Sequence, residues 1–227
     1  MLSNFGSLQP VSNIGGELLP RRSTPLIPNE FYHVYNRGHD RNRIFFEREN
    51  YLHFLRRLRK YVVPEHAIVV AYVLMPNHYH FILRAVTENL SNGMQRLGIS
   101  YTKSINRRNN REGNLFQGPY QAKHVDKENY LLHLSRYIHL NPVRATLVQS
   151  AEAWDFSSYP EYVGLRNGTL PTASIVLREF TNQTSEVCRQ TSEVWPDAVI
   201  KEAQVRYAAF VNSYRDSDRA NIEHLLY

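Results

Sequence analysis

The stretch AIVVAYVLMPNHYHFILR spans residues 67–84. Its first half is dense in Val, Ile and Tyr, which pack well on a pleated, buried surface. Pro76 and Asn77 are typical of a turn, and a second apolar run follows them. The stretch therefore predicts a β-hairpin, with one strand over 67–74 and the other over 78–84.

Two histidines separated by one residue begin the second of these strands. Because successive side chains of a strand point to opposite faces, His78 and His80 should face the same way, roughly 6.6 Å apart along the strand. Two imidazoles in this arrangement can share a metal ion, at about 2.1 Å from each nitrogen. Such a pair is weak evidence by itself, since the chain has ten histidines and chance pairing is the alternative.

Elements of both types flank the hairpin. Strict alternation and helical spacing of apolar residues predict, in chain order, a strand over 31–36, helices over 47–62 and 90–105, and a short strand over 121–125. A further helix is expected over 127–140, because Pro142 disfavours the helical conformation at the residue before it. A last helix is expected over about 195–214, after a polar linker at 181–193.

A second segment that could carry chemistry is RYIHLNPVR, residues 136–144. Tyr137 and Asn141 are four residues apart, which places them on one helical face and separates them by about 6 Å of rise. For the segment alone, ordinary roles are the more common ones. Tyr137 would then be a half-buried packing residue, and Asn141 would mark the end of a helix.

The bulk composition indicates an anionic partner and a reducing compartment. The 227 residues include 27 Lys and Arg against 21 Asp and Glu, a formal charge of +6, which favours nucleic acid as a partner. The lone Cys188 excludes an intramolecular disulfide and a cysteine-rich zinc module. No apolar run of about 18 residues could span a bilayer, and no secretory signal is evident. We therefore expect a cytoplasmic protein with no membrane partner.

The segments together resemble the REP-associated tyrosine transposases, a branch of the HUH superfamily related to single-tyrosine insertion-sequence transposases. The motifs that carry the resemblance are YHVYNRG at 32–38, YVLMPNHYH at 72–80, Tyr101-Thr102, Phe116-Gln117, residues 137–143, and the later Trp154, Ser157-Ser158-Tyr159 and Tyr162-x-Gly164. They cover most of residues 30–165. Each motif is unspecific alone, whereas their conjunction is specific.

The resemblance implies an α+β fold, a ferredoxin-like antiparallel sheet with packed helices, known as the HUH endonuclease fold. The predicted order of strands and helices agrees with it. The implied organisation is a flexible N-terminal arm at 1–28, an HUH single-tyrosine transposase domain at 29–168, and a partly helical C-terminal extension at 169–227.

The resemblance also assigns roles to the two segments. His78 and His80 match the paired histidines of the family, Asn141 matches the third metal ligand, and Tyr137 matches the nucleophile. Insertion-sequence relatives carry Gln in place of this Asn, which is one reason to favour the REP-associated branch. The implied cofactor is Mg²⁺ or Mn²⁺, and attack by Tyr137 would leave a 5′-phosphotyrosine and a free 3′-OH.

The implied function is a transposase that cleaves and rejoins single-stranded DNA at hairpin-containing repetitive extragenic palindromic elements. A nucleoid-associated bacterial protein is expected, with a monomer favoured by the branch and a dimer as the alternative. Basic residues could contact DNA phosphates, although ordinary solvated faces would look similar. They are Arg37, Arg41, Arg43, Lys103, Arg107, Arg108, Arg111, Lys123 and Arg144.

Two other functions are compatible with parts of this pattern. One is a domesticated hairpin-binding protein without turnover, for which an intact set of His78, His80, Tyr137 and Asn141 would be unnecessary. The other is a metal-dependent phosphohydrolase that attacks through water, which would tolerate Tyr137→Phe. The nicking enzyme should lose all cleavage with this substitution.

Overall fold

The computed structural model describes residues 26–126, 128–181 and 195–226 of the 227-residue chain. Several sequence-based expectations fall outside these ranges: nearly all of the arm at 1–28, nearly all of the linker at 181–193, Cys188, and the expected helix start at Lys127. Within the ranges described, no helix combines the length and apolar character needed to cross a membrane.

The described residues include a four-stranded antiparallel sheet in the order β2-β3-β1-β4. Its strands and the two helices between them are β1 Phe31–Arg37, α1 Arg48–Tyr61, β2 Ala67–Met75, β3 His78–Ala85, α2 Leu90–Arg108 and β4 Gln121–Val125. Each of the two helices connects strands that are not neighbours in the sheet. This is the ferredoxin-like α+β arrangement, so the predicted fold class is confirmed.

The hairpin at the centre of this fold forms as the sequence predicts. A two-residue turn brings Met75 of β2 opposite His78 of β3. The other edge of β3 pairs with β1, so that Tyr35 lies opposite His80. The two histidines therefore lie near the turn end of β3, with a paired strand on each side.

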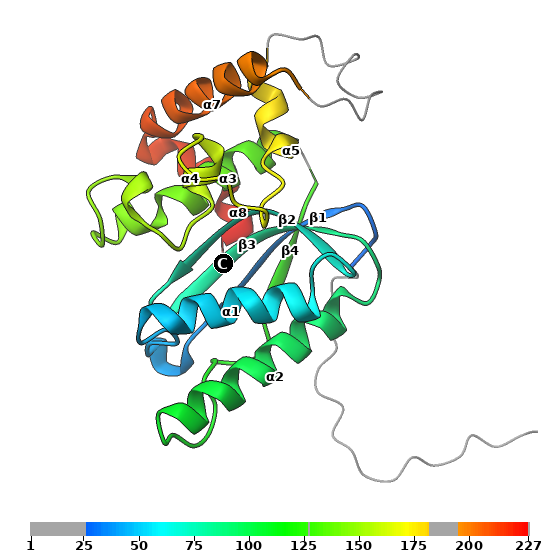
Figure 1. Ribbon diagram of the computed structural model, residues 1–227, viewed down its shortest axis with the longest axis vertical. Helices are drawn as coiled ribbons and strands as arrows, with labels where there is room; N and C mark the ends of the chain where they lie inside the picture. The colour runs from blue at the N-terminus through cyan, green and yellow to red at the C-terminus, as the bar shows by residue number, and fades with distance from the viewer. Residues whose placement is uncertain (1–25, 127, 182–194, 227) are drawn as a thin grey trace, which may run out of the picture.

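Helices α1 and α2 cover one face of the sheet (Figure 1). Tyr79 and Phe81 of β3 pack on this face against Phe54 of α1, with ring centroids 5.1 and 6.3 Å apart. Phe54 meets Tyr101 of α2 edge to face at 4.9 Å, and the Tyr101 hydroxyl donates to the carbonyl of Ile44 at 2.7 Å. This side of the molecule is thus held mainly by apolar and aromatic packing.

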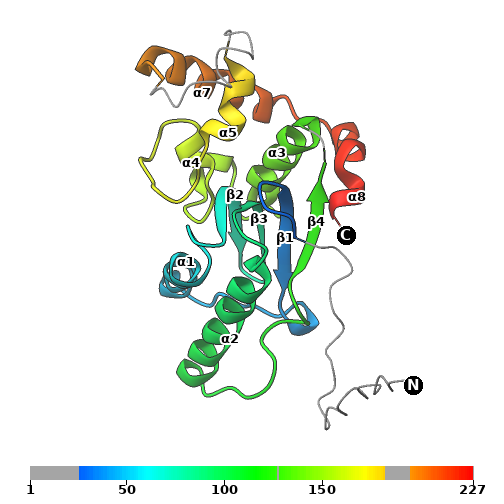
Figure 2. The ribbon, with the colours of Figure 1, turned by 90° about the vertical axis from the view of Figure 1, so that its right-hand side faces the viewer.

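Helix α3, Glu128–Arg144, covers the opposite face, and the later helices pack around it. These are α4 Tyr159–Tyr162, α5 Ser174–Leu177, α7 Asp197–Asn212 and α8 Glu223–Leu226, with short 3-10 helices at η1 His39–Arg41, η2 Ala151–Ala153, η3 Arg178–Phe180 and η4 Asp216–Ile222. Figure 2 shows α8 beside β4, at the edge of the sheet. The last described part of the chain therefore lies against the same sheet that begins the fold.

The segment between α3 and α4 protects the outer edge of the sheet. Leu74 of β2 donates its N–H to the carbonyl of Phe156 at 2.8 Å, and Ser158 donates to the carbonyl of Tyr72 at 3.0 Å. Unpaired edge strands invite pairing with other chains, and this segment satisfies part of the β2 edge.

The expected end of the α3 helix before Pro142 is wrong, because α3 continues to Arg144 with Pro142 inside it. Proline has no N–H to donate to the carbonyl four residues earlier, which usually interrupts a helix. Here the N–H of Ala145 donates to the carbonyl of Asn141 at 2.9 Å, so the next turn closes despite the proline. Asn141 is therefore held within a helix, one turn after Tyr137.

Candidate active site

His78 and His80 lie on the side of β3 that is covered by α3. Their ring centroids are 5.1 Å apart, with an angle of 84° between the ring planes. His80 is buried, with 3% of its surface exposed, and His78 is partly buried. The strand thus holds two imidazoles close together, near the solvent-accessible end of the sheet face.

Burial lowers the pKa of both imidazoles. The pKa of His78 falls to about 4, chiefly because desolvation penalises the charged ring. A hydrogen bond with the Asn141 side chain opposes this shift, and the charge of Arg37 adds to it. The pKa of His80 falls well below its usual value, again mainly through desolvation, and then through the nearby His33 and His78. At pH 7 both rings are neutral, so each has a nitrogen lone pair with which it can bind a metal ion.

Hydrogen bonds at the Nδ1 atoms orient both rings. The Nδ1 of His78 lies 2.7 Å from Oδ1 of Asn77, and the Nδ1 of His80 lies 2.8 Å from Nε2 of His33. His33 is itself fully buried, and its Nδ1 lies 2.6 Å from the carbonyl oxygen of Leu225. Because Nδ1 is engaged in both rings, Nε2 is the nitrogen of each that could bind a metal ion.

Tyr137 reaches the same place from α3. Its ring lies edge-on to that of His80, with the centroids 6.0 Å apart and an interplanar angle of 84°. The guanidinium carbon of Arg144 lies 5.5 Å from the centroid of the Tyr137 ring. Tyr137 is 5% exposed, so its ring is held in position by its neighbours. The expected nucleophile therefore lies beside one of the expected metal ligands.

Asn141 completes the group from the following turn of α3. Its Nδ2 atom donates to the carbonyl of Tyr137 at 3.1 Å, and its side chain lies close enough to His78 to raise the pKa of that ring. Because Nδ2 donates to Tyr137, the amide oxygen is the Asn141 atom that remains available to a metal ion beside His78. The structure thus brings together all four residues expected from sequence: His78, His80, Tyr137 and Asn141.

A pocket of about 800 Å³ opens beside the two histidines. Its lining residues come mainly from β1, from the β2–β3 turn and from the segment before β4: Tyr35, Asn36, Arg37, Arg41, Asn77, His78, His80, Gln117, Gly118, Pro119 and Gln121. Arg37 donates through Nε to the Gln117 side chain, and Asn36 donates to the carbonyl of Gly118 at 3.0 Å. Polar and cationic side chains therefore line part of the pocket, as a site for a phosphate-bearing chain requires.

The chemistry of these donors fits a divalent ion. Two neutral imidazoles and an amide oxygen form a mixed nitrogen and oxygen set, and metal-binding histidines usually have their second nitrogen engaged, as both have here. Across residues 26–126, 128–181 and 195–226, no group of three or more His, Cys, Asp or Glu side chains is arranged to hold a metal. The amide oxygen of Asn141 is available as a third protein ligand beside the two imidazoles.

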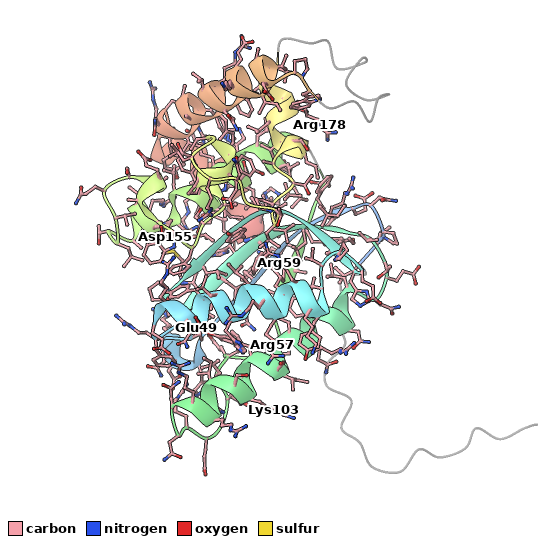
Figure 3. All side chains as sticks on the ribbon, in the orientation of Figure 1. Glu49, Arg57, Arg59, Lys103, Asp155 and Arg178 are labelled. Carbon is pink, nitrogen blue, oxygen red and sulfur yellow. The ribbon has the colours of Figure 1, made fainter. Side chains whose placement is uncertain are left out.

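The nine basic residues expected to contact DNA lie on different sides of the molecule. Arg37 and Arg41 line the pocket, and Arg144 lies over the Tyr137 ring. Lys123 of β4 donates to the carbonyl of His224 at 2.9 Å. The rest lie on the α1 and α2 side of the sheet, where Figure 3 labels Lys103: Arg43, Lys103, Arg107, Arg108 and Arg111.

Two of the residues on that far side already have partners in the fold. Arg108 forms an ion pair with Glu47 at 2.7 Å, and the guanidinium of Arg111 lies 5.8 Å from the ring centroid of Phe46. These interactions give the two arginines ordinary structural roles beside α1. The structure does not bring them together with the Tyr137 group.

Sequence reasoning missed several residues that surround the site. His33 was quoted as part of a motif without a role, and Gln117 likewise, although each contacts a site residue. The signal for His33 was available: it has the same strand parity as Tyr35, so it projects from β1 toward the face of His80. The contact with Leu225 has no such local signal, because it joins positions 192 residues apart.

Comparisons with known proteins give one family match and solved structures that are similar to this chain. The family model described as "Transposase IS200 like" matches residues 28–141. A solved structure described as a REP-associated tyrosine transposase bound to a REP hairpin is similar, with 15% identity, a TM-score of 0.53, and coverage of 67% of this chain and 97% of that one. At that identity the likeness supports the shared fold alone.

A second solved structure, a Deinococcus radiodurans R1 protein described as a candidate transposase, is 17% identical and covers 53% of this chain and 95% of that one. Its TM-score of 0.37 is too low to support an argument. No curated protein matches the chain.

Proposed function

The chain belongs to the IS200-like transposase family, and from that membership we propose that it cuts and rejoins single-stranded DNA through a covalent bond to Tyr137. The observation that carries the proposal is the meeting of two segments far apart in sequence. Tyr137 lies beside His80, and the side chain of Asn141, one turn later, lies beside His78. A nucleophile next to a set of metal-binding donors is the arrangement that phosphoryl transfer requires.

In the proposed reaction, the Tyr137 phenol oxygen attacks the phosphorus of a DNA phosphodiester. A bond forms between that oxygen and phosphorus, the bond from phosphorus to the 3′ oxygen breaks, and the leaving 3′ oxygen takes up a proton. The products are a 5′-phosphotyrosine and a free 3′-OH. Because the phosphotyrosine retains an activated phosphate, a second 3′-OH can attack it and restore both the DNA bond and the phenol.

We propose Mg²⁺ or Mn²⁺ as the cofactor, held by His78, His80 and the amide oxygen of Asn141. When bound, a divalent ion would neutralise charge on the non-bridging phosphate oxygens and assist loss of the phenol proton. The two imidazoles suit this role because burial keeps them neutral at pH 7. With two nitrogen ligands and no carboxylate in the set, tighter binding of Mn²⁺ than of Mg²⁺ is expected.

The proposed substrate is a single strand that carries a hairpin, of the repetitive extragenic palindromic type. The solved relative is described as bound to a REP hairpin. In this chain, the pocket beside His78 presents Arg37, Arg41, Asn36 and Gln117. The two arginines supply charge for phosphates, which supports DNA as the ligand.

The test is a cleavage assay with a DNA strand labelled at its 3′ end. The full-length chain would be incubated with Mn²⁺ and a hairpin oligonucleotide taken from DNA flanking its gene, then run on a denaturing gel. A 3′ label is required because the protein would be attached to the 5′ end of the downstream fragment. We expect a labelled protein–DNA adduct that chelation of the metal abolishes and Tyr137→Phe removes completely.

The matched control is Tyr130→Phe, which removes a hydroxyl from the same helix two turns earlier. It should cut like the wild type. Cleavage without adduct that persists in Tyr137→Phe would contradict the proposal and favour a water-dependent phosphohydrolase. Hairpin binding without any cleavage, with either metal, would indicate a domesticated binding protein.

A further inference from the structure

His33 lies next to the proposed metal ligands and is not one of them. It is fully buried in β1, with its Nε2 atom 2.8 Å from Nδ1 of His80. Its Nδ1 atom lies 2.6 Å from the main-chain carbonyl oxygen of Leu225, in α8. The imidazole of His33 thus links a residue at the site to the C-terminal segment.

The protons of this chain of contacts can be assigned from donor and acceptor chemistry. A carbonyl oxygen can only accept, so Nδ1 of His33 must carry a proton and donate it to Leu225. In a neutral ring the other nitrogen then has the lone pair, so Nε2 of His33 accepts. The proton between the two rings therefore belongs to Nδ1 of His80, and Nε2 of His80 has the lone pair.

The alternative is a doubly protonated His33 that donates from both nitrogens. It would place a positive charge on a ring with no exposed surface. Lys123 lies directly opposite His33 on β4, so a charged His33 would lie beside another cation. A buried cation beside another cation is costly, so the neutral arrangement is favoured.

We propose that His33 and the carbonyl of Leu225 act as a positioning relay, which keeps Nε2 of His80 deprotonated and directed at the metal site. The proposal rests on the metal site proposed above. It assigns His33 a positioning role, and it makes the C-terminal segment a part of the active site rather than a surface addition. Outer partners of this kind typically change metal affinity by about 10- to 100-fold.

The position of Leu225 is itself well supported, as a relay requires. The side chains of Leu225 and Leu226 are 2% and 0% exposed and belong to the core between the sheet and α3. Lys123 donates to the carbonyl of His224 at 2.9 Å, and the rings of Tyr130 and His224 have centroids 4.7 Å apart. The acceptor carbonyl is therefore fixed by contacts from both β4 and α3.

The first test is direct observation of the tautomer by NMR, on full-length protein labelled with ¹⁵N in histidine and without added metal. His80 of the wild type should show one neutral tautomer, protonated at Nδ1. In His33→Phe, which lacks both the acceptor and the donor, this preference should be lost. An unchanged His80 tautomer in His33→Phe would overturn the proposal, whether or not the protein binds metal.

The second test measures Mn²⁺ affinity by calorimetry, in the absence of DNA. His33→Phe should raise the Kd by about 10- to 100-fold. His33→Gln should recover most of the affinity, because its amide oxygen can accept from His80 and its amide N–H can donate to Leu225. Equal Kd values for the wild type and His33→Phe would contradict the relay.

The matched control is His66→Phe, which replaces another buried histidine, 8% exposed, that bonds to Thr87 at 3.1 Å before β2. It should leave the Mn²⁺ Kd unchanged. If His66→Phe weakened Mn²⁺ binding as much as His33→Phe does, the effect of His33→Phe would be general destabilisation, and the relay would be overturned. A wild type that binds no Mn²⁺ while its His80 shows the Nδ1–H tautomer would refute the metal site and leave the tautomer assignment standing.

Discussion

The two faces of the sheet are built from alternate residues of the same strands, and they are held in different ways. Under α1 and α2, Tyr79 and Phe81 pack among aliphatic and aromatic side chains. Under α3, the buried strand residues include His33 and His80, each hydrogen-bonded at one or both ring nitrogens. The period of two along a strand therefore separates a packing face from a face on which directional bonds position reactive groups.

Directional bonds also attach α3 to the later helices. His139 bonds to the hydroxyls of Tyr207 and Ser158, at 2.7 and 2.8 Å. Arg136, with a side chain 4% exposed, forms an ion pair with Asp218 at 3.0 Å. Hydrogen bonds and ion pairs have preferred directions that apolar contacts lack, so they can fix how a helix is rotated. This explains how the ring of Tyr137 is held at one orientation relative to His80.

Neighbouring residues of β3 give the sharpest contrast between the faces. His78→Ala should lower the rate of DNA nicking by at least about 100-fold, since it removes a proposed metal ligand. Tyr79→Phe changes the adjacent residue, which points to the packing face, and should alter the rate by less than about twofold. Single-turnover cleavage at saturating Mn²⁺ measures both, and similar rates for the two variants would remove the functional distinction between the faces.

Substitutions on the packing face should instead lower the stability of the fold. Leu58 of α1 is fully buried there, and Leu58→Ala should lower the free energy of unfolding by about 2–5 kcal/mol through loss of buried surface and formation of a cavity. The nicking rate of the folded fraction at 25 °C should stay within about twofold of wild type. Urea unfolding and cleavage assays on the same preparation check this, and a rate loss as large as that of His78→Ala would show that the faces are coupled.

Basic residues on the two sides should contribute unequally to DNA binding. Arg37→Ala, in the pocket, should weaken hairpin binding by about 5- to 10-fold and reduce its dependence on salt. Lys103→Ala removes a cation from the far side (Figure 3) and should change the affinity by less than about twofold. Fluorescence anisotropy at two salt concentrations measures both, and an equal loss with Lys103→Ala would place DNA on the α2 side.

The sequence predicts those features of the site that depend on the spacing of nearby residues. Alternation along β3 was enough to predict that His78 and His80 share a face, and a four-residue spacing was enough to pair Tyr137 with Asn141. That the two pairs meet was an inference from family resemblance, because strand and helix periodicity cannot specify which helix covers which face. The helix end before Pro142 was misjudged because the turn beyond a proline can still close through later N–H groups.

No pattern of neighbouring residues in the sequence predicts the contact between His33 and Leu225. It depends on how the last helix docks, and that is decided by the burial of Leu225 and Leu226 and by the bond from Lys123 to His224. Polar residues at buried strand positions, as His33 is, nevertheless require a partner, so the sequence could have indicated that one exists.

The most direct test of the Tyr137 nucleophile is to locate the covalent bond by mass spectrometry. Trypsin cleaves after Arg136 and Arg144, giving the peptide YIHLNPVR, in which Tyr137 is the sole hydroxyl-bearing side chain. After incubation with hairpin DNA and Mn²⁺ and digestion of the DNA by nuclease, this peptide should carry the mass of a 5′-linked nucleotide. A nucleotide on another peptide, or cleaved DNA with no modified peptide, would contradict the mechanism.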